Sequence, residues 1–201
     1  DERTAAIEAF NAQHRWVKRG IALQPVKFGI SFTHAMLNQA GALVHIYADG
    51  SVQVNHGGTE MGQGLHTKIL AIVAHELGVQ PNHIRVMNTS TDKVPNTSAT
   101  AASSGSDLNG AAVKRACETL RARLSEVAAD LLVCAPEDVR FAAGFVMSDE
   151  QQLSFSTVAG AAYAAQVSLS STGFYRTPDI HYDPEKGRGK PFHYFAYGAA
   201  V

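Results

Sequence analysis

Cysteine is scarce in this sequence, with only Cys117 and Cys134 among 201 residues. Both fall in a segment with helical periodicity, and their spacing matches no metal-binding pattern. So few cysteines exclude a disulfide-rich secreted scaffold, because such scaffolds depend on several bridges. We interpret both side chains as reduced thiols of a cytoplasmic protein.

Long apolar runs and an excess of one charge are also missing. No run approaches the roughly 18 apolar residues of a transmembrane helix. The first residues, 1–4, lack the apolar core of a signal peptide. The 17 basic and 18 acidic side chains leave a net charge of −1, so the basic footprint of a nucleic-acid-binding protein is absent. We therefore expect neither a membrane nor a nucleic acid as a partner.

The apolar periodicity predicts an α+β domain. Helices are expected over residues 4–18, 64–77, 107–133 and 156–166, and strands over 21–33, 42–48, 51–56, 84–87, 167–175 and 193–201. Asp49-Gly50 is a strong hairpin signal, and a second hairpin is expected over 139–155, turning at 148–150. Residues 178–192 are expected to form an exposed loop. The irregular order of strands and helices favours a mixed sheet with antiparallel hairpins and packed helices.

A glycine-rich loop, GGTEMGQGLHTK at residues 57–68, is the most informative stretch. Its glycines permit close approach of a backbone, and the helix that follows offers unpaired N–H groups. This combination suits an anionic or acceptor-rich ligand, and the Gln63 amide lies where it can donate to one. Glu60 is either a general base or a surface or structural carboxylate, and we favour the second role. The alternative is a turn whose glycines serve packing alone.

A polar, Ser/Thr-rich stretch at 88–104 leads into the long predicted helix. A loop of this length inside a compact domain more often has a function than serves only as a connection. Ser103 and its neighbours carry hydroxyl and N–H groups that suit a phosphate or a pterin edge. The competing interpretation is simple capping of the helix by Ser106 or Asp107. The two roles use different N–H groups and are compatible.

Nine histidines invite a metal hypothesis, but no pair has convincing ligand spacing. His75-Glu76 resembles the start of a zinc-binding helix, yet position 79, where the second histidine belongs, is Val79. We therefore predict no metal-ligating residue in this chain.

The glycine-rich loop resembles the molybdopterin-contacting loop of the xanthine dehydrogenase large subunit. Further stretches resemble the same family in the same order along the chain: 28–33, 37–42, 94–103, 107–110, 173–178 and 191–198. The resemblance implies that Gly62, Gln63, Gly64 and Ser103 contact the molybdenum cofactor. It also implies that Phe32, Thr33, Ala101 and Ala102 line a flat slot for a purine substrate, in which Phe32 stacks on the ring.

The family's intact enzyme hydroxylates hypoxanthine and xanthine at a molybdenum–molybdopterin centre. Electrons then pass through Fe–S clusters and FAD to NAD, on other parts of the assembly. The family's catalytic glutamate belongs to a Gly-Glu-Pro-Pro motif that this sequence does not contain. We therefore expect residues 1–201 to be a segment of a molybdenum cofactor-binding domain, incomplete at both ends, with no catalytic residue. Alone, it is expected to be inactive and to hold no cofactor.

Two other interpretations stay open. The segment belongs to another molybdenum hydroxylase, such as an aldehyde oxidase, or to a non-catalytic ligand-binding domain that kept the fold. The combination of FGISFT at 28–33 with FYRTP at 174–178 favours the xanthine branch. The resemblance assigns no individual role to His66, Lys68 or Arg176.

Overall fold

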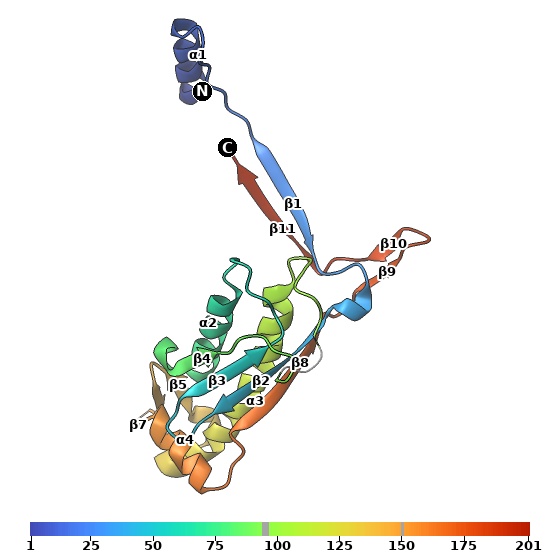
Figure 1. Ribbon diagram of the computed structural model, residues 1–201. Helices are drawn as coiled ribbons and strands as arrows, with labels where there is room; N and C mark the ends of the chain where they lie inside the picture. The colour runs from blue at the N-terminus through green and yellow to red at the C-terminus, as the bar shows by residue number, and fades with distance from the viewer. Residues whose placement is uncertain (94–96, 150) are drawn as a thin grey trace.

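The protein folds into a layered body from which a two-stranded ribbon projects (Figure 1). The computed structural model describes residues 1–93, 97–149 and 151–201. Residues 94–96, part of one family-like stretch, and Glu150, in the expected turn at 148–150, lie outside the described residues. The body comprises residues 39–176, and the ribbon comprises two strands at opposite ends of the chain.

A mixed four-stranded sheet forms one layer of the body. Its strands are β2 (Gln39–Ile46), β3 (Val52–His56), β4 (Ile84–Val86) and β8 (Ser170–Arg176), in the order β4-β3-β2-β8. β2 is antiparallel to β3 and β8, whereas β4 is parallel to β3. The hairpin expected at Asp49-Gly50 is confirmed, because Gly50 has a φ of 85° and Asp49 Oδ1 accepts from the Ser51 N–H at 2.9 Å. Mixed pairing with packed helices confirms the predicted fold class.

Three helices complete the body. They are α2 (Leu65–Leu77), α3 (Gly105–Leu132) and α4 (Phe155–Ala164), all near their expected bounds. α3 packs on β2 and β8, with α2 and α4 beside it (Figure 1). α4 packs against α3, and the apolar faces of all three helices contribute to one core, because residues three and four apart share a side of a helix. In α2 the buried side chains are Leu65, Ile69, Val73 and Leu77.

The hairpin expected over 139–155 is confirmed in part, because β6 (Phe145–Met147) and β7 (Gln152–Ser154) pair antiparallel. A strand that was not expected, β5 (Arg140–Ala142), pairs with β6 and completes a three-stranded sheet. The extra turn, Ala143-Gly144, has φ values of 53° and 87°, and alanine gives no signal for such a turn. The expected loop at 178–192 contains a short hairpin of β9 (His181–Asp183) and β10 (Arg188–Lys190). Single 3-10 turns lie at Ala35–Leu37, Pro81–His83 and Pro136–Asp138.

The ribbon pairs β1 (Gln24–Ile30) with β11 (Tyr194–Ala200) and carries α1 (Glu2–Gln13) beyond its far end (Figure 1). The Asp1 side chain caps α1 by accepting from the Thr4 N–H at 3.1 Å. The expectation that this helix reaches residue 18 was wrong, and Trp16 is 85% exposed. α1 buries no residue, so packing does not extend it. Among the described residues, no helix combines the length and apolar character needed to cross a bilayer.

Candidate functional site

The Gln63 loop, residues 57–64, connects β3 to the start of α2. Gly62 and Gly64 have φ values of 100° and 76°, a region that L side chains rarely adopt. A Cβ at either position would meet no atom within 4 Å. These two glycines are therefore required by backbone conformation, and the space beside them is open to a ligand.

The Glu60 carboxylate organises this loop. Oε1 accepts from the backbone N–H groups of Gly62 at 2.8 Å and Gly64 at 3.0 Å, and Oε2 accepts from that of His66 at 3.0 Å. These bonds, led by the one from His66, lower the pKa of Glu60 to about 2. Glu60 is thus a structural carboxylate, as favoured from the sequence. The expectation of free N–H groups at the start of this helix was wrong in part, since Glu60 uses that of His66.

The Gln63 side chain makes two hydrogen bonds within the loop but keeps one amide hydrogen for a further acceptor. Its Oε1 accepts from the Met61 N–H at 2.6 Å, and its Nε2 donates to the Thr59 carbonyl at 2.8 Å. An amide nitrogen carries two hydrogens, so one stays available. The Thr59 N–H in turn donates to Thr100 Oγ1 at 2.8 Å. That bond joins the Gln63 loop to Thr100, the residue that immediately precedes a second segment.

The second segment is the turn at residues 101–104, which leads into α3. Ala102 and Ser103 have φ values of 55° and 53°, both unusual for residues other than glycine. The helix begins at Gly105, two residues earlier than expected. Its N-cap is Ser104, whose hydroxyl donates to the Ala101 carbonyl at 2.9 Å, so capping by Ser106 or Asp107 was wrong. In the part of the chain that the structure describes, the first-turn N–H groups of residues 105–107 have no acceptor.

A hollow of about 380 Å³ lies between the two segments. Its lining residues are Met61, Gln63, Leu65, Lys68, Thr100, Ala101, Ser103, Gly105 and Ser106. Three predicted site residues, Gln63, Ala101 and Ser103, therefore meet at one place. The hollow offers an amide N–H, an ammonium, serine hydroxyls and the N-terminal turn of α3. This donor set fits a ligand rich in anionic oxygens and polar ring edges.

The predicted slot residues Phe32, Thr33 and Ala102 do not line this hollow. Phe32 is half-buried and packs against the core, and Asn38 holds its backbone N–H and carbonyl with two bonds of 2.8 Å. Thr33 is exposed. Their nearest link to the turn is the Ser31 N–H, which donates to the Ala102 carbonyl at 3.5 Å. The flat slot stays a prediction.

Ser31 is a residue that sequence reasoning missed. It is 4% exposed and has a φ of 120°. Its Oγ donates to the Pro191 carbonyl at 2.9 Å and accepts from the His193 N–H at 3.2 Å. Ser31 thus joins the base of the ribbon to the turn at 101–104. Nothing local in FGISFT signals these partners, because they belong to segments far away along the chain. Backbone strain of this kind gathers where the surrounding structure fixes a functional geometry.

Two histidines lie beneath the Gln63 loop. His56 is fully buried, and its Nδ1 accepts from the Gly58 N–H at 3.1 Å. Its ring centroid lies 5.2 Å from that of His66. Burial, helped by the charge of His66, lowers the pKa of His56 to about 4, so His56 is neutral at pH 7. Within the described ranges, no group of three or more His, Cys, Asp or Glu side chains is placed to hold a metal ion.

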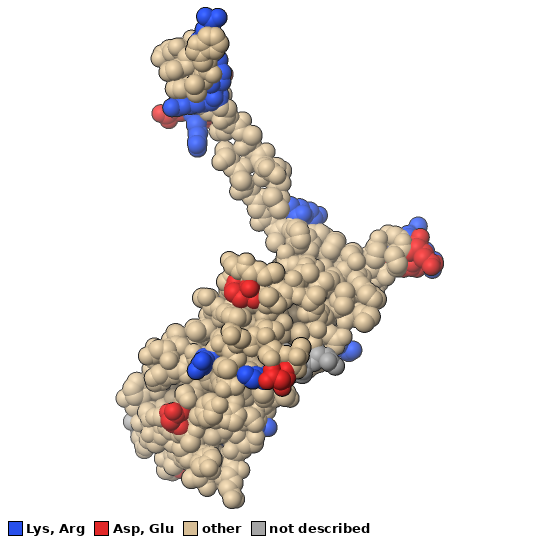
Figure 2. Space-filling view, viewed as in Figure 1, with Lys and Arg blue, Asp and Glu red and all other residues tan. Residues whose placement is uncertain are grey.

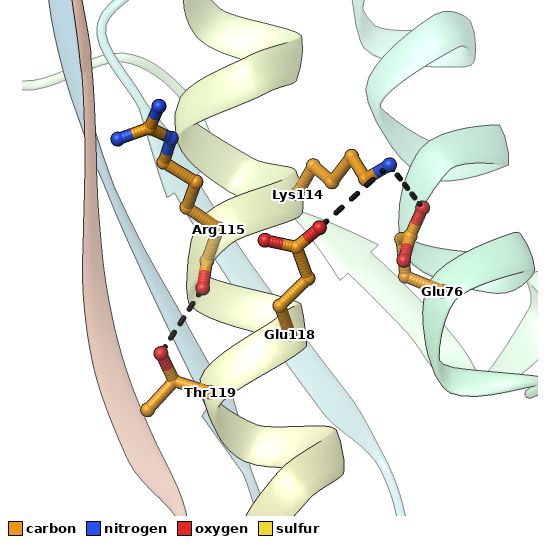
Figure 3. Close-up of polar contacts among 5 residues, drawn as sticks. All are labelled: Glu76, Lys114, Arg115, Glu118 and Thr119. Atoms are coloured by element: carbon orange, nitrogen blue, oxygen red, sulfur yellow. Dashed lines mark hydrogen bonds and ion pairs between the residues drawn. The ribbon is translucent and has the colours of Figure 1, made fainter.

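A charged brace joins α2 to α3 (Figure 3). The Lys114 ammonium lies 3.7 Å from both Glu76 on α2 and Glu118 on α3. Arg115 points away from this brace, and its guanidinium lies 5.5 Å from the ring of Tyr175. Packing of α2 on α3, more than this exposed brace, keeps side by side the two helices whose N-terminal ends border the hollow.

Comparison with known proteins gives a consistent result. Residues 1–201 match the family described as "Molybdopterin cofactor-binding domain". The chain is 50% identical over 198 residues to "Xanthine dehydrogenase/oxidase" of Gallus gallus and 47% identical over 199 residues to "Xanthine dehydrogenase" of Oryza sativa subsp. japonica. These alignments cover 98% and 99% of the chain. The chain spans only 13% of the length of each of these relatives.

Solved structures share the fold. Quinoline 2-oxidoreductase from Pseudomonas putida 86 superimposes with a TM-score of 0.78 at 23% identity, over 98% of this chain and 26% of that one. The Cu,Mo-CO dehydrogenase superimposes with a TM-score of 0.74 at 21% identity, over 98% of this chain and 25% of that one. At such low identity these structures establish the architecture alone.

Proposed function

This chain belongs to the molybdopterin cofactor-binding domain family, and we propose that it is the cofactor- and substrate-lining segment of a xanthine dehydrogenase. The observation that carries the proposal is the hollow in which the Gln63 loop meets the turn at 101–104. Identities of 47% and 50% to xanthine dehydrogenases over nearly the whole chain support the same choice.

The residues of the hollow fit the molybdenum–molybdopterin cofactor. Gly62 and Gly64 do not line the hollow, but they leave open space beside the loop, so a planar ring can approach its backbone. Gln63 keeps one amide hydrogen for an acceptor on that ring. Ser103 and the first-turn N–H groups of α3 suit its anionic oxygens. When bound, the cofactor supplies the oxidation of a substrate carbon with oxygen taken from water.

The substrate in this proposal is a purine, hypoxanthine or xanthine. Phe32 supplies an aromatic face, Thr33 an exposed hydroxyl, and Ala101 and Ala102 small side chains that leave room for a flat ring. The bond between Ser31 and Ala102 supports the pairing, because it holds the residue before Phe32 against the alanine turn. Aromatic contacts of this kind contribute about 0.5–1.5 kcal/mol beyond the buried area.

In our proposal, the other groups that the reaction requires lie outside this chain. A catalytic glutamate, Fe–S clusters and FAD come from the rest of a longer molybdenum subunit and its partner domains in the cytoplasm. Residues 1–201 are then a segment of the cofactor-binding domain. On its own, the chain is expected to be inactive and to retain no cofactor, so xanthine turnover by the purified chain would contradict this part of the proposal.

The proposal is tested in the longer polypeptide by molybdenum content and by xanthine-dependent NAD reduction. Gln63→Leu removes a donor to the cofactor together with the two bonds that Gln63 makes within its loop, and we expect molybdenum retention to weaken by at least about tenfold. Gln152→Leu on β7, at an exposed position, is the matched control and should retain molybdenum as the wild type does. Purified wild-type polypeptide that carries no molybdenum would overturn the cofactor assignment.

Variants of the predicted substrate slot test substrate binding separately from folding. Phe32→Ala is expected to reduce turnover sharply, but Phe32 also packs against the core. Thr33→Val changes an exposed hydroxyl without touching the core and is therefore the sharper variant. Reduced xanthine turnover at unchanged molybdenum content supports the slot. Full turnover in both variants would discard it, and broad aldehyde oxidation without purine oxidation would favour an aldehyde oxidase.

A further inference from the structure

Both faces of the ribbon are apolar. Residues paired across two strands share a face, so the register places Val26 and Phe28 with Tyr194 on one side, and Phe195 and Tyr197 on the other. Each of these five side chains is at least 43% exposed. A strand exposed to water on one side alternates apolar and polar residues, whereas a strand with two apolar faces is typical of a sheet covered on both sides.

Charge is nearly absent from the ribbon. Lys27 is the only ionisable residue of either sign in β1, and β11 has tyrosines but no acid or base. The Lys27 ammonium lies over the rings of Phe195 and Tyr197, at 4.4 and 5.8 Å. Figure 2 accordingly shows the stretch between α1 and the body as almost wholly uncharged. Natural sheet edges that face solvent usually carry charges that prevent pairing, so this surface lacks the usual protection.

The two outer edges of the ribbon differ. Among the described residues, β1 and β11 pair only with each other. β1 is continuous but contains Pro25, which has no N–H to donate to a further strand. β11 contains no proline over its seven residues. Its outer edge therefore offers an unbroken row of backbone groups for a partner strand.

The described chain does not cover this surface. The ribbon extends away from the body, and α1 buries none of its own residues (Figure 1). An isolated two-stranded ribbon is marginally stable in water. The relatives of this chain are far longer, since it spans 13% of their length. A strand in the remainder of the same polypeptide is thus available to every copy at high effective concentration.

We propose that the outer edge of β11 and both faces of the ribbon are the docking surface for a β-strand, with apolar side chains around it, from the part of the same polypeptide outside these 201 residues. The inference rests on the proposed function, in which this chain is a segment of a longer subunit. The ribbon then becomes the inner part of a larger covered sheet. Through Ser31, that docking also fixes the base of the ribbon against the turn at 101–104.

The test places a charge on the ribbon and on the body. Tyr197→Glu changes a 73% exposed side chain of β11, and Tyr163→Glu changes a 69% exposed side chain of α4 as the matched control. In the 201-residue chain alone, both variants should stay folded and soluble. In the longer polypeptide, Tyr197→Glu should lower the melting temperature by at least about 5 °C or abolish soluble expression. Tyr163→Glu should change it by less than about 1 °C.

Hydrogen exchange supplies a measurement without a variant. Amides of β11 should exchange at least about 100-fold more slowly in the longer polypeptide than in the isolated chain, because both edges are then paired. Amides at the centre of β3 serve as the internal reference and should change little. Equal exchange of β11 in both proteins would overturn the inference.

One outcome distinguishes a second copy of the chain from a strand of the same polypeptide as the partner of the ribbon. Another distinguishes failure of the proposed function from failure of the docking surface. If the isolated chain forms a dimer that Tyr197→Glu dissociates, and the longer polypeptide tolerates that variant, the ribbon binds a second copy and the inference fails. Molybdenum content of the wild-type longer polypeptide reports separately on the proposed function. A protein without molybdenum that still shows protected β11 amides would refute the function and support the docking surface.

Discussion

The ribbon and the sheet of the body contain antiparallel pairs of equal length. β1 and β11 pair over seven residues, and β2 and β8 also pair over seven. In β2, Ala40, Ala42 and Val44 are wholly buried, whereas every residue of β11 is exposed. The difference is α3, which packs on β2 and β8, whereas no helix in the described part of the chain packs along the ribbon in this way. We therefore expect strand pairs of equal length to differ in stability, because burial of apolar area stabilises a sheet more than its hydrogen bonds do.

The largest difference in stability between body and ribbon is expected from alanine substitution of two glycines that lie in strands. A Cβ on Gly173 in β8 would lie 1.9 Å from the Ala112 carbonyl oxygen and 2.7 Å from the Ala116 nitrogen, both backbone atoms of α3. A Cβ on Gly198 in β11 would meet no atom within 4 Å. We expect Gly173→Ala to lower the free energy of unfolding by about 3 kcal/mol. Gly198→Ala should be neutral or stabilise by about 0.5 kcal/mol.

Urea unfolding of the isolated chain, followed by circular dichroism, measures both free energies. The two variants add the same methyl group to the same residue type, so each serves as the other's control. A cost below about 1 kcal/mol for Gly173→Ala would show that α3 and β8 are not locked by their close approach. The contrast between body and ribbon would then need another origin.

Acid should loosen the body first, since neither β1 nor β11 contains a histidine or a carboxylate. His56 has a pKa of about 4 in the folded protein and an ordinary value of 6.5. The unfolded chain therefore takes up a proton before the folded protein does. The stability contributed by neutral His56 is complete above pH 6.5 and is lost as the pH falls towards 4. We expect a loss of about 3 kcal/mol from this residue.

His56→Asn isolates that contribution, because asparagine offers an acceptor near the position of Nδ1 and does not titrate. Its free energy of unfolding should fall less steeply between pH 6.5 and 4 than that of the wild type. His181→Asn changes an exposed histidine of β9 and should keep the wild-type slope. Equal slopes in all three proteins would remove His56 as the acid-sensitive group.

The parts of the fold that follow local rules were predictable from the sequence. The spacing of Leu65, Ile69 and Val73 indicated where α2 lies, because helical periodicity is set within a few turns. Asp49-Gly50 indicated the hairpin for the same reason. The Ala143-Gly144 turn was missed because its conformation is imposed by the strands on either side rather than by its residues.

The candidate site was predictable only in part. Resemblance identified Gln63, Ala101 and Ser103, which the structure brings together at one hollow. The three bonds of Glu60 and the long-range contacts of Ser31 were not predictable, because they depend on how distant segments meet. The exposed ribbon was likewise missed. Its aromatic and β-branched residues predict strands, but they do not say whether anything in the same chain covers them.

The smallest expected effect concerns the tether between the two regions. The Tyr194 hydroxyl at the base of β11 lies 3.1 Å from both carboxylate oxygens of Asp107 on α3. Desolvation, with the Asp107 bond and charge, raises the pKa of Tyr194 above its ordinary value of 10. The tether's stabilisation is therefore present below pH 10 and is lost as the pH rises through that raised pKa.

Tyr194→Phe removes the hydroxyl and keeps the ring. Because the side chain is 45% exposed, we expect a loss below about 1 kcal/mol in global stability, with faster hydrogen exchange confined to β11. Tyr197→Phe removes a hydroxyl that has no partner among the described residues and should alter neither. Unchanged β11 exchange in Tyr194→Phe would mean that Ser31 and the packing of Phe192 on Gly29 hold the ribbon without the tether. Faster hydrogen exchange confined to β11 would show that the order of the ribbon, unlike that of the strands of the body, depends on single polar contacts.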